Sequence, residues 1–457
     1  MKKYYLPEKV LASGDERMNN ESIKKLFGGF CFGRSEIIFQ KGDNCCLVIG
    51  STSLPQIPDG AEYALRIDEN GAAVSAKDYA CLIRGYTSML MQIDFDADGK
   101  LYLTEANING IFKIARRMVH YCVFPETTFH QFRKLIRYAA LMQFTHVVIE
   151  FWGMIKLDCF KELAWDNAYD KDEVRAIIKE IKELGLEPIP MFNHLGHATA
   201  SRLVSGKHVV LDRYPHRYSW FTLDGWAWNI DNEEVWDLLK AVRLELYDLF
   251  GEGEYFHAGL DEAYIYANDP ERYAKLPEFM EKLTKEIEKE GRRPMLWADM
   301  FLPPEAYGDF AKKELCAKNS VEACSAVVDR LSRKTILIDW QYHHKEAPIS
   351  TTVHFKNSGL DVMGAPWLDV DNARAHADTI VENKLFGIMQ TTWHTLPSDL
   401  QRMIIFARYC GLPEAPWSKH SAYREETATL MRKISYEIGK YEDFGWMEYQ
   451  VIVSPQK

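Results

Sequence analysis

Two adjacent acids, Asp261 and Glu262, close the segment YFHAGLDE, and they are the strongest candidates for chemistry in this chain. Consecutive side chains at a strand end point in different directions, so the two carboxylates suit two different tasks. Cleavage of a glycosidic bond has two such tasks: an acid protonates the leaving oxygen, and a second group stabilises the anomeric carbon. If the sugar carries a 2-acetamido group, its own carbonyl oxygen can be the nucleophile. The protein then supplies only a carboxylate that holds the amide N–H.

The segments that must hold this pair alternate between apolar strands and amphipathic helices after about residue 114. Helical stretches such as FHQFRKLIRYAALMQ and KDEVRAIIKEIKELG separate the strands, and several end at glycine, a common helix stop. Eight strands in this rhythm predict a (β/α)8 barrel, with a doubly wound open sheet as the alternative. The candidate strands are RRMVHYCV, THVVIEFW, EPIPMFNH, EYFHAGLDE, RPMLWADM, TILIDWQY, DVMGAPW and FGIMQTTW.

Polar and aromatic side chains gather at the ends of these strands. The carboxyl ends of all strands in such a barrel meet at one rim, where active sites lie. Core packing alone does not explain why so many strands end in this way. The rim residues are Glu150, Trp152, Asn193, His194, His197, Asp261, Glu262, Trp297, Asp299, Trp340, Tyr342, Trp367, Asp369, Trp393 and His394.

The first part of the chain has a different rhythm, with short strands around the helix-like CLIRGYTSMLMQI. The segment RIDENGAAVSA predicts a hairpin in which Asn70-Gly71 supplies the positive φ angles of a tight turn. We therefore expect a small α+β domain over residues 1–112. A barrel over residues 113–457 should follow it, with a helical C-terminal extension, SAYREETATLMRKISYEIGKYEDFGWMEYQVIV, packed against the barrel.

The composition excludes several classes of partner. Lys and Arg total 55 against 66 for Asp and Glu, which gives a net charge of -11 without any basic run. We therefore expect neither nucleic acid nor a membrane as a partner, and no stretch is apolar for long enough to span a bilayer. The aromatic content of 13% suits a protein that stacks on flat apolar faces.

The cysteines and the first residues predict a cytoplasmic protein. The nine cysteines lack CxxC spacing, which favours reduced thiols over disulfides or a metal site. The opening MKKYYLPEKVLASGDERMNN has neither the apolar core nor the small-residue cleavage site of a signal peptide. If a signal peptide has been removed, the periplasm or the exterior would replace the cytoplasm.

The segment HAGLDE resembles the H-x-G-x-D-E signature of glycoside hydrolase family 20, the β-N-acetylhexosaminidases. Three further segments, MFNHLGHA, LWADM and QTTWHT, are similar to the family's third, fifth and eighth strand motifs, and the small first domain is similar to the family's as well. The resemblance covers most of the chain. It implies an exo-acting, retaining hydrolase of terminal, non-reducing β-linked N-acetylhexosamine (GlcNAc or GalNAc), without cofactor or metal.

The resemblance also implies roles for matched residues. Glu262 would be the general acid and afterwards the base that activates water. Asp261 would hold the acetamido N–H and stabilise an oxazolinium-like intermediate, and His197 would orient a catalytic acid. Asp369 and Arg117 would bond the sugar hydroxyls, with the neighbouring Arg116 as an alternative to Arg117.

Aromatic walls complete the expected site. Trp297, Trp367 and Trp393 would enclose the sugar and its acetamido methyl, because the C–H faces of sugars stack on indoles. The remaining candidates for substrate binding are Glu150, His257, Trp340 and Tyr342.

The chain also departs from the family pattern. Asn193 and Leu195 stand where the family usually has Asp and Pro, and IEFWGMIKLD replaces the usual second-strand motif. The segment APWLD lacks the tyrosine that often binds the acetamido carbonyl, and Tyr342 is our candidate to replace it. These changes leave the acid pair intact and the identity of the sugar open.

Three alternatives remain at this point. A conventional retaining glycosidase would need a second carboxylate about 5 Å from Glu262, for which Glu150 and Asp299 are candidates. A catalytically silent carbohydrate-binding barrel could dispense with Glu262. A metal site at His194 and His197 is disfavoured because their spacing after a glycine turn is not helical. We expect an oligosaccharide or glycoconjugate as substrate and keep a homodimer open.

Overall fold

The computed structural model describes residues 2–201, 204–308, 316, 318–367, 369–393, 396–416 and 423–435. Eight parallel strands form a closed barrel, which confirms the (β/α)8 prediction against the open doubly wound sheet. The ring closes where β10 pairs with β19, with Arg117 opposite Ile388. In ring order the strands are β10 (Arg117–Cys122), β11 (His146–Glu150), β12 (Glu187–Met191), β15 (Tyr255–His257), β16 (Arg293–Trp297), β17 (Ile336–Trp340), β18 (Asp361–Ala365) and β19 (Gly387–Thr391).

Helices surround this ring, and local capping fixes where several of them begin. Thr128 and Gln131 form a capping box at the start of α3, and Asp170 and Glu173 form one at the start of α4. The helices of the barrel half are α3 (Phe129–Leu141), α4 (Lys171–Glu183), α5 (Val210–Arg213), α6 (Glu233–Phe250), α7 (Tyr264–Ala267), α8 (Pro270–Tyr273), α9 (Leu276–Lys289), α10 (Pro304–Tyr307), α11 (Val321–Val328), α12 (Ser350–His354), α13 (Val370–Asn383), α14 (Leu396–Cys410) and α15 (Tyr423–Ile434).

Apolar side chains from the strands fill the inside of the barrel. Met118, Val148, Ile189, Met295 and their neighbours form a buried cluster that ends at Trp297 and Trp393 near the rim. The interior is therefore a packed core, and the chemistry is confined to the rim.

The longest departure from the βα rhythm lies between β12 and β15. Residues 192–254, which we call the excursion, contain the hairpin β13 (Ala200–Ser201) and β14 (Val204–Gly206), the short helix α5 and the long helix α6. Several of its side chains contribute to the rim described below.

The N-terminal part forms a six-stranded sheet with strand order β3-β2-β4-β6-β5-β9 and a smaller three-stranded sheet. Its helices are α1 (Glu21–Phe30) and α2 (Tyr79–Leu90). Its strands are β1 (Lys3–Tyr5), β2 (Lys9–Gly14), β3 (Glu36–Lys41), β4 (Cys46–Gly50), β5 (Tyr63–Asp68), β6 (Gly71–Ala76), β7 (Ile93–Phe95), β8 (Leu101–Thr104) and β9 (Ala106–Asn109).

The predicted hairpin is present, but its turn is one residue earlier than expected. Asp68 pairs with Gly71, so Glu69 and Asn70 form the loop. The Asp68 carboxylate accepts a hydrogen bond from the Asn70 N–H at 2.8 Å and so stabilises the turn. Gly71 opens β6 with a φ of +141°, and a Cβ there would lie 1.9 Å from the Ile49 carbonyl oxygen. Close strand packing, rather than the turn, therefore requires the glycine.

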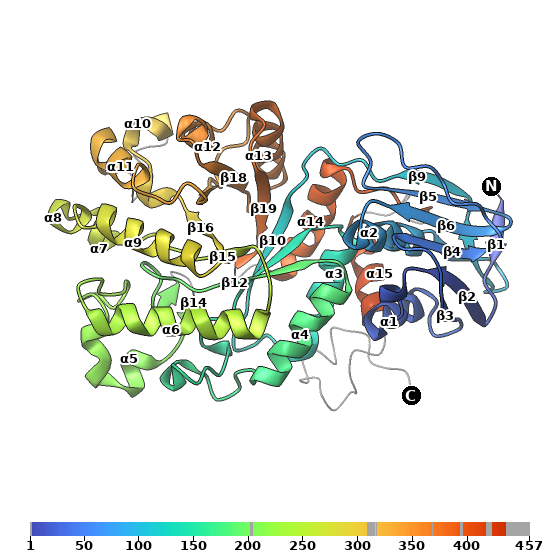
Figure 1. Cartoon of the computed structure of the whole chain (residues 1–457), viewed down its shortest axis with the longest axis horizontal. Helices are drawn as coiled ribbons and strands as arrows, with labels where there is room; N and C mark the ends of the chain where they lie inside the picture. Colours follow the sequence, from blue (N-terminus) through green and yellow to red (C-terminus); the bar gives the residue numbers. More distant parts are fainter. Residues whose placement is uncertain are drawn as a thin grey trace.

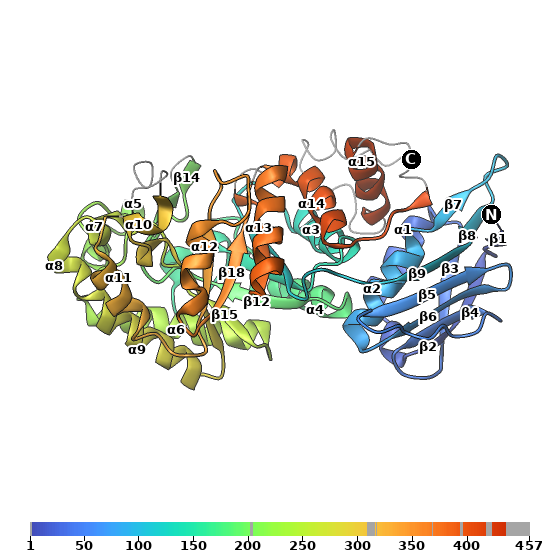
Figure 2. The same cartoon turned by 90° about the horizontal axis from the view of Figure 1, so that it is seen from above.

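The barrel and the N-terminal sheets lie side by side along the long axis of the molecule (Figures 1 and 2). Helix α15 packs on α1, α3 and α14 between the two parts, as expected for the C-terminal segment up to Ile434. Residues 436–457 of that segment lie outside the described residues. The division at residue 112 stays a prediction.

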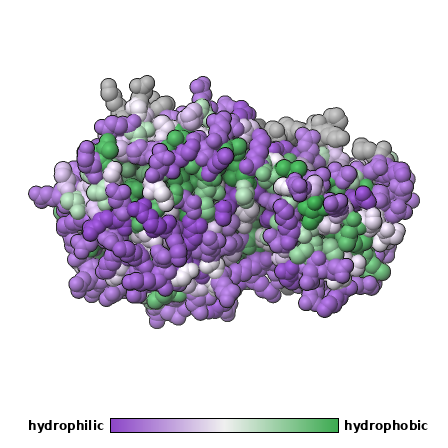
Figure 3. Space-filling view, turned by 45° about the horizontal axis from the view of Figure 1, so that its top comes forward, coloured by the Kyte–Doolittle hydropathy of each residue, from purple (hydrophilic) through white to green (hydrophobic). Residues whose placement is uncertain are grey.

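The surface is mostly hydrophilic, with scattered apolar patches on the face that Figure 3 shows. Among the described residues, none of the helices combines the length and the apolar character needed to cross a membrane.

Candidate active site

An irregular stretch of backbone after β15 brings Asp261 and Glu262 to the carboxyl rim. Gly259, Leu260 and Glu262 have φ angles of +68°, +90° and +52°. Left-handed conformations of this kind cost residues other than glycine about 1–3 kcal/mol and persist only where the surroundings enforce them. Asn193 is part of those surroundings, since a Cβ on Gly259 would lie 2.7 Å from its Nδ2.

His197 lies between the two acids. Its Nε2 is 3.0 Å from Oε2 of Glu262 and 3.4 Å from Oδ2 of Asp261. The preceding Gly196 permits this approach, because a Cβ there would lie 1.8 Å from the carbonyl oxygen of Asp261. The Gly-His step after β12 therefore packs directly on the end of β15.

Burial and charge together set the protonation of this group. Burial raises the pKa of the Asp261 carboxyl, although the charges of His197 and Lys207 oppose the shift. Burial also disfavours the imidazolium form of His197, but Asp261 and the hydrogen bond with Glu262 outweigh it and raise the pKa of His197. The His197 imidazole thus bridges the two carboxylates.

The backbone of Glu262 is held from both sides. Its N–H donates to Oδ2 of Asp299 at 2.9 Å, and its carbonyl accepts a hydrogen bond from Nε1 of Trp226 at 2.8 Å. The Trp226 ring also packs on the His197 ring, with centroids 4.7 Å apart. These contacts fix the position from which the Glu262 side chain extends.

Asp299 is itself an unusual carboxyl group. Its Oδ1 accepts a hydrogen bond from Nε1 of Trp340 at 3.1 Å. Burial, together with the charge of Asp261, raises the pKa of Asp299 to about 8. Asp299 is therefore largely protonated at neutral pH and links the Glu262 backbone to an aromatic wall.

The aromatic wall consists of residues at or just after the carboxyl ends of β16, β17, β18 and β19. The rings of Trp340 and Tyr342 have centroids 5.2 Å apart, and those of Tyr342 and Trp367 are 5.1 Å apart. Trp393 donates from Nε1 to the Tyr342 hydroxyl at 2.8 Å, and its ring lies 5.7 Å from that of Trp297. Five predicted aromatic residues thus form one connected cluster, of which Trp297 is fully buried.

A second charged cluster lies beneath the acids. Lys207 Nζ is 2.7 Å from Oε1 of Glu150, whose other oxygen is 3.3 Å from Nε2 of His120. Burial would raise the pKa of the Glu150 carboxyl, but the charges of Lys207 and His120 outweigh it and hold that pKa well below its usual range. Glu150 is thus a paired, ionised carboxylate.

The same cluster has some features of a metal site. Ligand atoms of His120, Cys122 and Glu150 lie within 4.8 Å of one another. The Lys207 ammonium already provides the positive charge that Glu150 requires. Burial raises the pKa of the Cys122 thiol well above its usual value, which disfavours the thiolate that metals bind. The donor set therefore does not suit a metal ion.

A family model for the catalytic domain of glycosyl hydrolase family 20 matches residues 153–420. The chain belongs to glycosyl hydrolase family 20. It is thus a glycoside hydrolase of the β-N-acetylhexosaminidase family, as the HAGLDE motif predicted.

Solved structures share the fold of this family 20 chain at low sequence identity. The β-N-acetylhexosaminidase of Streptomyces coelicolor matches with a TM-score of 0.64 at 14% identity, over 97% of this chain and 96% of that one. The chitobiase of Flavobacterium johnsoniae matches with a TM-score of 0.64 at 16% identity, over 95% of this chain and 70% of that one. No curated protein matches the sequence.

One predicted sugar contact of the family 20 chain is wrong. Arg117 is the first residue of β10, at the amino end of the barrel and opposite the rim. Its Nη1 lies 3.0 Å from Oε1 of Glu62 and donates to the carbonyl of Ile114 at 2.7 Å. The alternative, Arg116, packs over the ring of Phe386 at the same end. The strand enters the barrel at these arginines, so neither reaches a sugar on the carboxyl rim.

Several other predicted contacts lie deeper than the sequence suggested. Glu150, His257 and Trp297 are fully buried. His257 Nδ1 accepts a hydrogen bond from the Gly259 N–H, so this histidine supports the strand end. His194 is also buried, with Nε2 3.0 Å from Nη1 of Arg243 on α6. Their substrate-binding roles, where predicted, stay predictions.

Asp369 and His394 complete the predicted rim. Asp369 caps α13 by accepting hydrogen bonds from the N–H groups of Asp371 and Asn372, and its other oxygen pairs with Lys345. Asp369 therefore stabilises the start of α13, and its contact with a sugar hydroxyl stays a prediction. His394 lies outside the described residues.

Sequence reasoning missed Lys207 and Trp226, which both come from the excursion. Strand periodicity cannot place side chains that lie on no barrel strand. The segment WFTLDGWAWN carried a usable signal, because three tryptophans in a polar loop need something to pack against.

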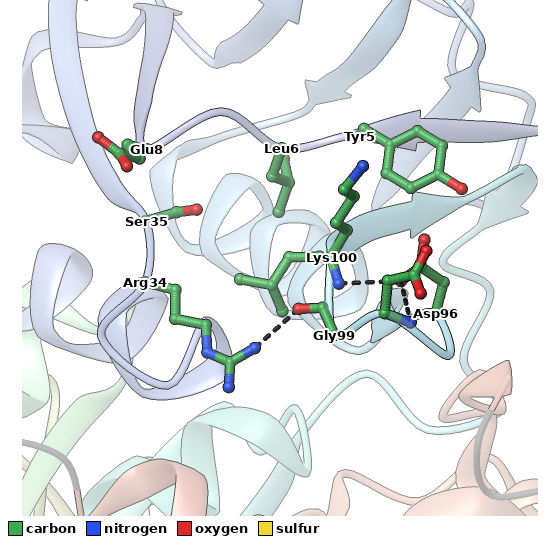
Figure 4. A pocket seen from close by; sticks show the side chains of 10 residues that line it. Tyr5, Leu6, Glu8, Arg34, Ser35, Asp96, Gly99 and Lys100 are labelled. Carbon is green, nitrogen blue, oxygen red and sulfur yellow. Dashed lines mark hydrogen bonds between the residues drawn. The ribbon is translucent and has the colours of Figure 1, made fainter.

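A second hollow lies on the N-terminal sheets, far from this rim (Figure 4). Its charged groups serve the local loops: Arg34 donates to the carbonyl of Gly99 at 2.7 Å, and Asp96 accepts from the N–H of Lys100 at 2.9 Å. These contacts stabilise a turn.

Proposed function

We propose that this protein is an exo-acting, retaining β-N-acetylhexosaminidase that uses the acetamido group of its substrate as the nucleophile. The observation that carries the proposal is the pair Asp261 and Glu262 on the rim, with both carboxylates in contact with His197 and next to a connected aromatic wall. Retaining hydrolysis assisted by the substrate needs one acid for proton transfer and one carboxylate for the amide.

Glu262 acts as the general acid and base in this scheme. It retains partial exposure at the rim, so it can reach the glycosidic oxygen, while Asp299 and Trp226 hold its backbone. It protonates the leaving oxygen and then takes a proton from the water that opens the intermediate. His197 stabilises the carboxylate that exists between the two steps.

Asp261 acts on the acetamido group. Its Oδ1 accepts a hydrogen bond from Asn193, and its Oδ2 retains a lone pair for the substrate N–H beside His197. Holding that N–H orients the carbonyl oxygen toward the anomeric carbon and stabilises the positive charge of the cyclic intermediate. In this proposal Trp340, Tyr342, Trp367 and Trp393 enclose the sugar and its methyl group.

The geometry gives less support to a protein nucleophile. Glu150 is buried and paired with Lys207, and both oxygens of Asp299 accept hydrogen bonds from protein groups. A silent binding barrel would not require Glu262 to contact His197. The cytoplasmic location and the homodimer stay predictions.

Chromogenic β-N-acetylglucosaminide and β-N-acetylgalactosaminide test the proposal directly. We expect release of the chromophore from at least one of them and competitive inhibition by the thiazoline analogue of the cyclic intermediate. The corresponding β-glucoside, which lacks the acetamido group, should be inert. Turnover of the glucoside at a comparable rate would instead support a protein nucleophile.

A further inference from the structure

Lys207 is a buried lysine that enters the site from the excursion. It is 4% exposed, and its ammonium lies 4.2 Å from the centre of the Trp152 ring. Its backbone is fixed as well: its N–H donates to the carbonyl of Thr199, and its carbonyl accepts from the N–H of Gly153 and from Nε1 of Trp165. Lys207 is therefore part of a rigid layer under the rim.

The ammonium contacts two side chains. Its Nζ is 2.7 Å from Oε1 of Glu150 and 3.4 Å from Oδ1 of Asn193. Asn193 in turn donates from Nδ2 to Oδ1 of Asp261 at 3.1 Å. A lysine can only donate, so its contact with Oδ1 selects the amide orientation in which Nδ2 faces Asp261.

Asp261 lies among more acids than cations. Without compensation, a buried carboxylate in such surroundings takes up a proton. Among the residues that the structure describes, the titratable groups around it are Glu150 on β11, His197 after β12, Lys207 after β14, Glu262 after β15, Asp299 after β16, Cys122 on β10, Cys316 before α11 and Tyr342 after β17. Lys207 and His197 are the cations that oppose protonation of Asp261.

We propose that Lys207 is a positioning residue for hydrolysis, because it orients the Asn193 amide so that Asn193 holds Asp261 toward the acetamido N–H. This inference rests on the proposed function. It assigns Lys207 a role beyond neutralising Glu150, and the two roles can be separated.

A double variant separates the positioning role of Lys207 from its role in neutralising Glu150. Lys207→Met alone removes the ammonium from the buried Glu150 carboxylate and leaves it with His120, so this variant can fail through instability. Lys207→Met combined with Glu150→Gln removes both charges and leaves a neutral side chain of similar size at each position. Glu150→Gln alone shows what the loss of the acid does while Lys207 still contacts Asn193.

We expect the double variant to melt within a few degrees of the wild type. Its kcat on the N-acetylated chromogenic substrate should fall by up to about 100-fold, which is the loss of rate that a small misplacement of a reacting group causes. KM should change less than kcat. The acid limb of the kcat/KM profile should move to higher pH, because Asp261 must be ionised to accept the N–H.

Two further variants sharpen the test. Asn193→Asp keeps Lys207 but replaces the amide donor with an acid, and it should move the acid limb in the same direction. Lys433→Met removes another buried lysine, on α15 and far from the rim, and should leave kcat and the pH profile unchanged.

Recovery of the wild-type kcat and pH profile in the double variant would overturn the inference, since Lys207 would then serve only Glu150. Absence of turnover in the wild type would instead remove the proposed function. In that case, crystal structures of the wild type and the double variant still decide the positioning role. An unchanged contact between Asn193 and Asp261 in the double variant would refute it.

Discussion

Glu262 and Asp261 are neighbours in sequence, yet different parts of the chain hold them. Asp299 and Trp226 fix the backbone of Glu262, whereas Asn193 binds the side chain of Asp261. His197 contacts both carboxylates. A change at either acid should therefore have its own kinetic signature.

Glu262→Gln removes proton transfer while keeping the size of the side chain. We expect kcat/KM on a chitobiose-type substrate to fall by about 100- to 10,000-fold, because the leaving sugar oxygen needs a proton. The loss should be smaller on a dinitrophenyl glycoside, whose leaving group departs without protonation. Glu252→Gln, at an exposed position before β15, is the matched control. Equal losses on both substrates would contradict the assigned role.

The raised pKa of Asp299 predicts that the free energy of unfolding depends on pH. Its pKa is raised to about 8 in the folded protein, so the native state holds a proton that the unfolded chain releases above about pH 4. The resulting stability is complete below about pH 4 and is lost as pH rises through 8. Asp299→Asn cannot titrate, so its free energy of unfolding should decline less between pH 5 and pH 9. Urea unfolding of both proteins across this range measures the difference, and parallel curves would refute the raised pKa.

At the scale of elements, the rim depends on a close approach between the loops after β12 and β15. Gly196→Ala would force a Cβ against the carbonyl of Asp261, now 1.8 Å from the ideal position of that atom. We expect a loss of about 1–3 kcal/mol, typical of overpacking, together with a fall in kcat because Asp261 and His197 shift. Thermal melting and steady-state kinetics report the two effects. A stable variant with full activity would show that the two loops can separate without cost.

The barrel strands were predictable because short apolar segments alternate with amphipathic helical segments along the sequence. All eight predicted strands overlap those of the structure, and the barrel arrangement places Asp261, Trp297 and Trp340 at the carboxyl ends of the successive strands β15, β16 and β17. Arg117 was misplaced because the motif match was followed even though the arginine opens its strand, which puts it at the amino end of the barrel. The cap at Asp369 was readable as an acid before a helix.

What the sequence could not supply is the path of the excursion. Lys207 and Trp226 reach the acids through loop geometry that depends on contacts such as the one between the Trp165 indole and the Lys207 carbonyl. Such loop contacts do not recur at a regular spacing in the sequence, so hydrophobic periodicity cannot predict them. Trp297 was correctly placed at the rim end of its strand, but its full burial depended on the packing of His257 and Trp393 around it.

At the scale of the whole molecule, Arg117 joins the N-terminal sheets to the barrel. Its guanidinium is 2% exposed, shares Glu62 with Arg84 and donates to the Ile114 carbonyl, so Arg117→Met should destabilise the protein by about 1–3 kcal/mol, as expected when a buried acceptor loses its donor. The folded fraction should keep its kcat and KM, because Arg117 lies at the end opposite the rim. Arg117→Met with Glu62→Gln should not recover this stability, because Arg84 then loses its carboxylate partner as well. A higher KM with an unchanged free energy of unfolding would instead indicate that Arg117 binds the sugar.

The origin of Lys207 in the excursion has a consequence for how such enzymes diversify. The strands supply the acids and most of the aromatic wall, while one inserted loop supplies a cation beneath them. Changing the part of the excursion around Lys207 would therefore alter the charge near the acids, while Asn193, His197 and the barrel strands stay in place. Selection for a new amino sugar could act on this interchangeable part, and libraries for engineered specificity are best concentrated there.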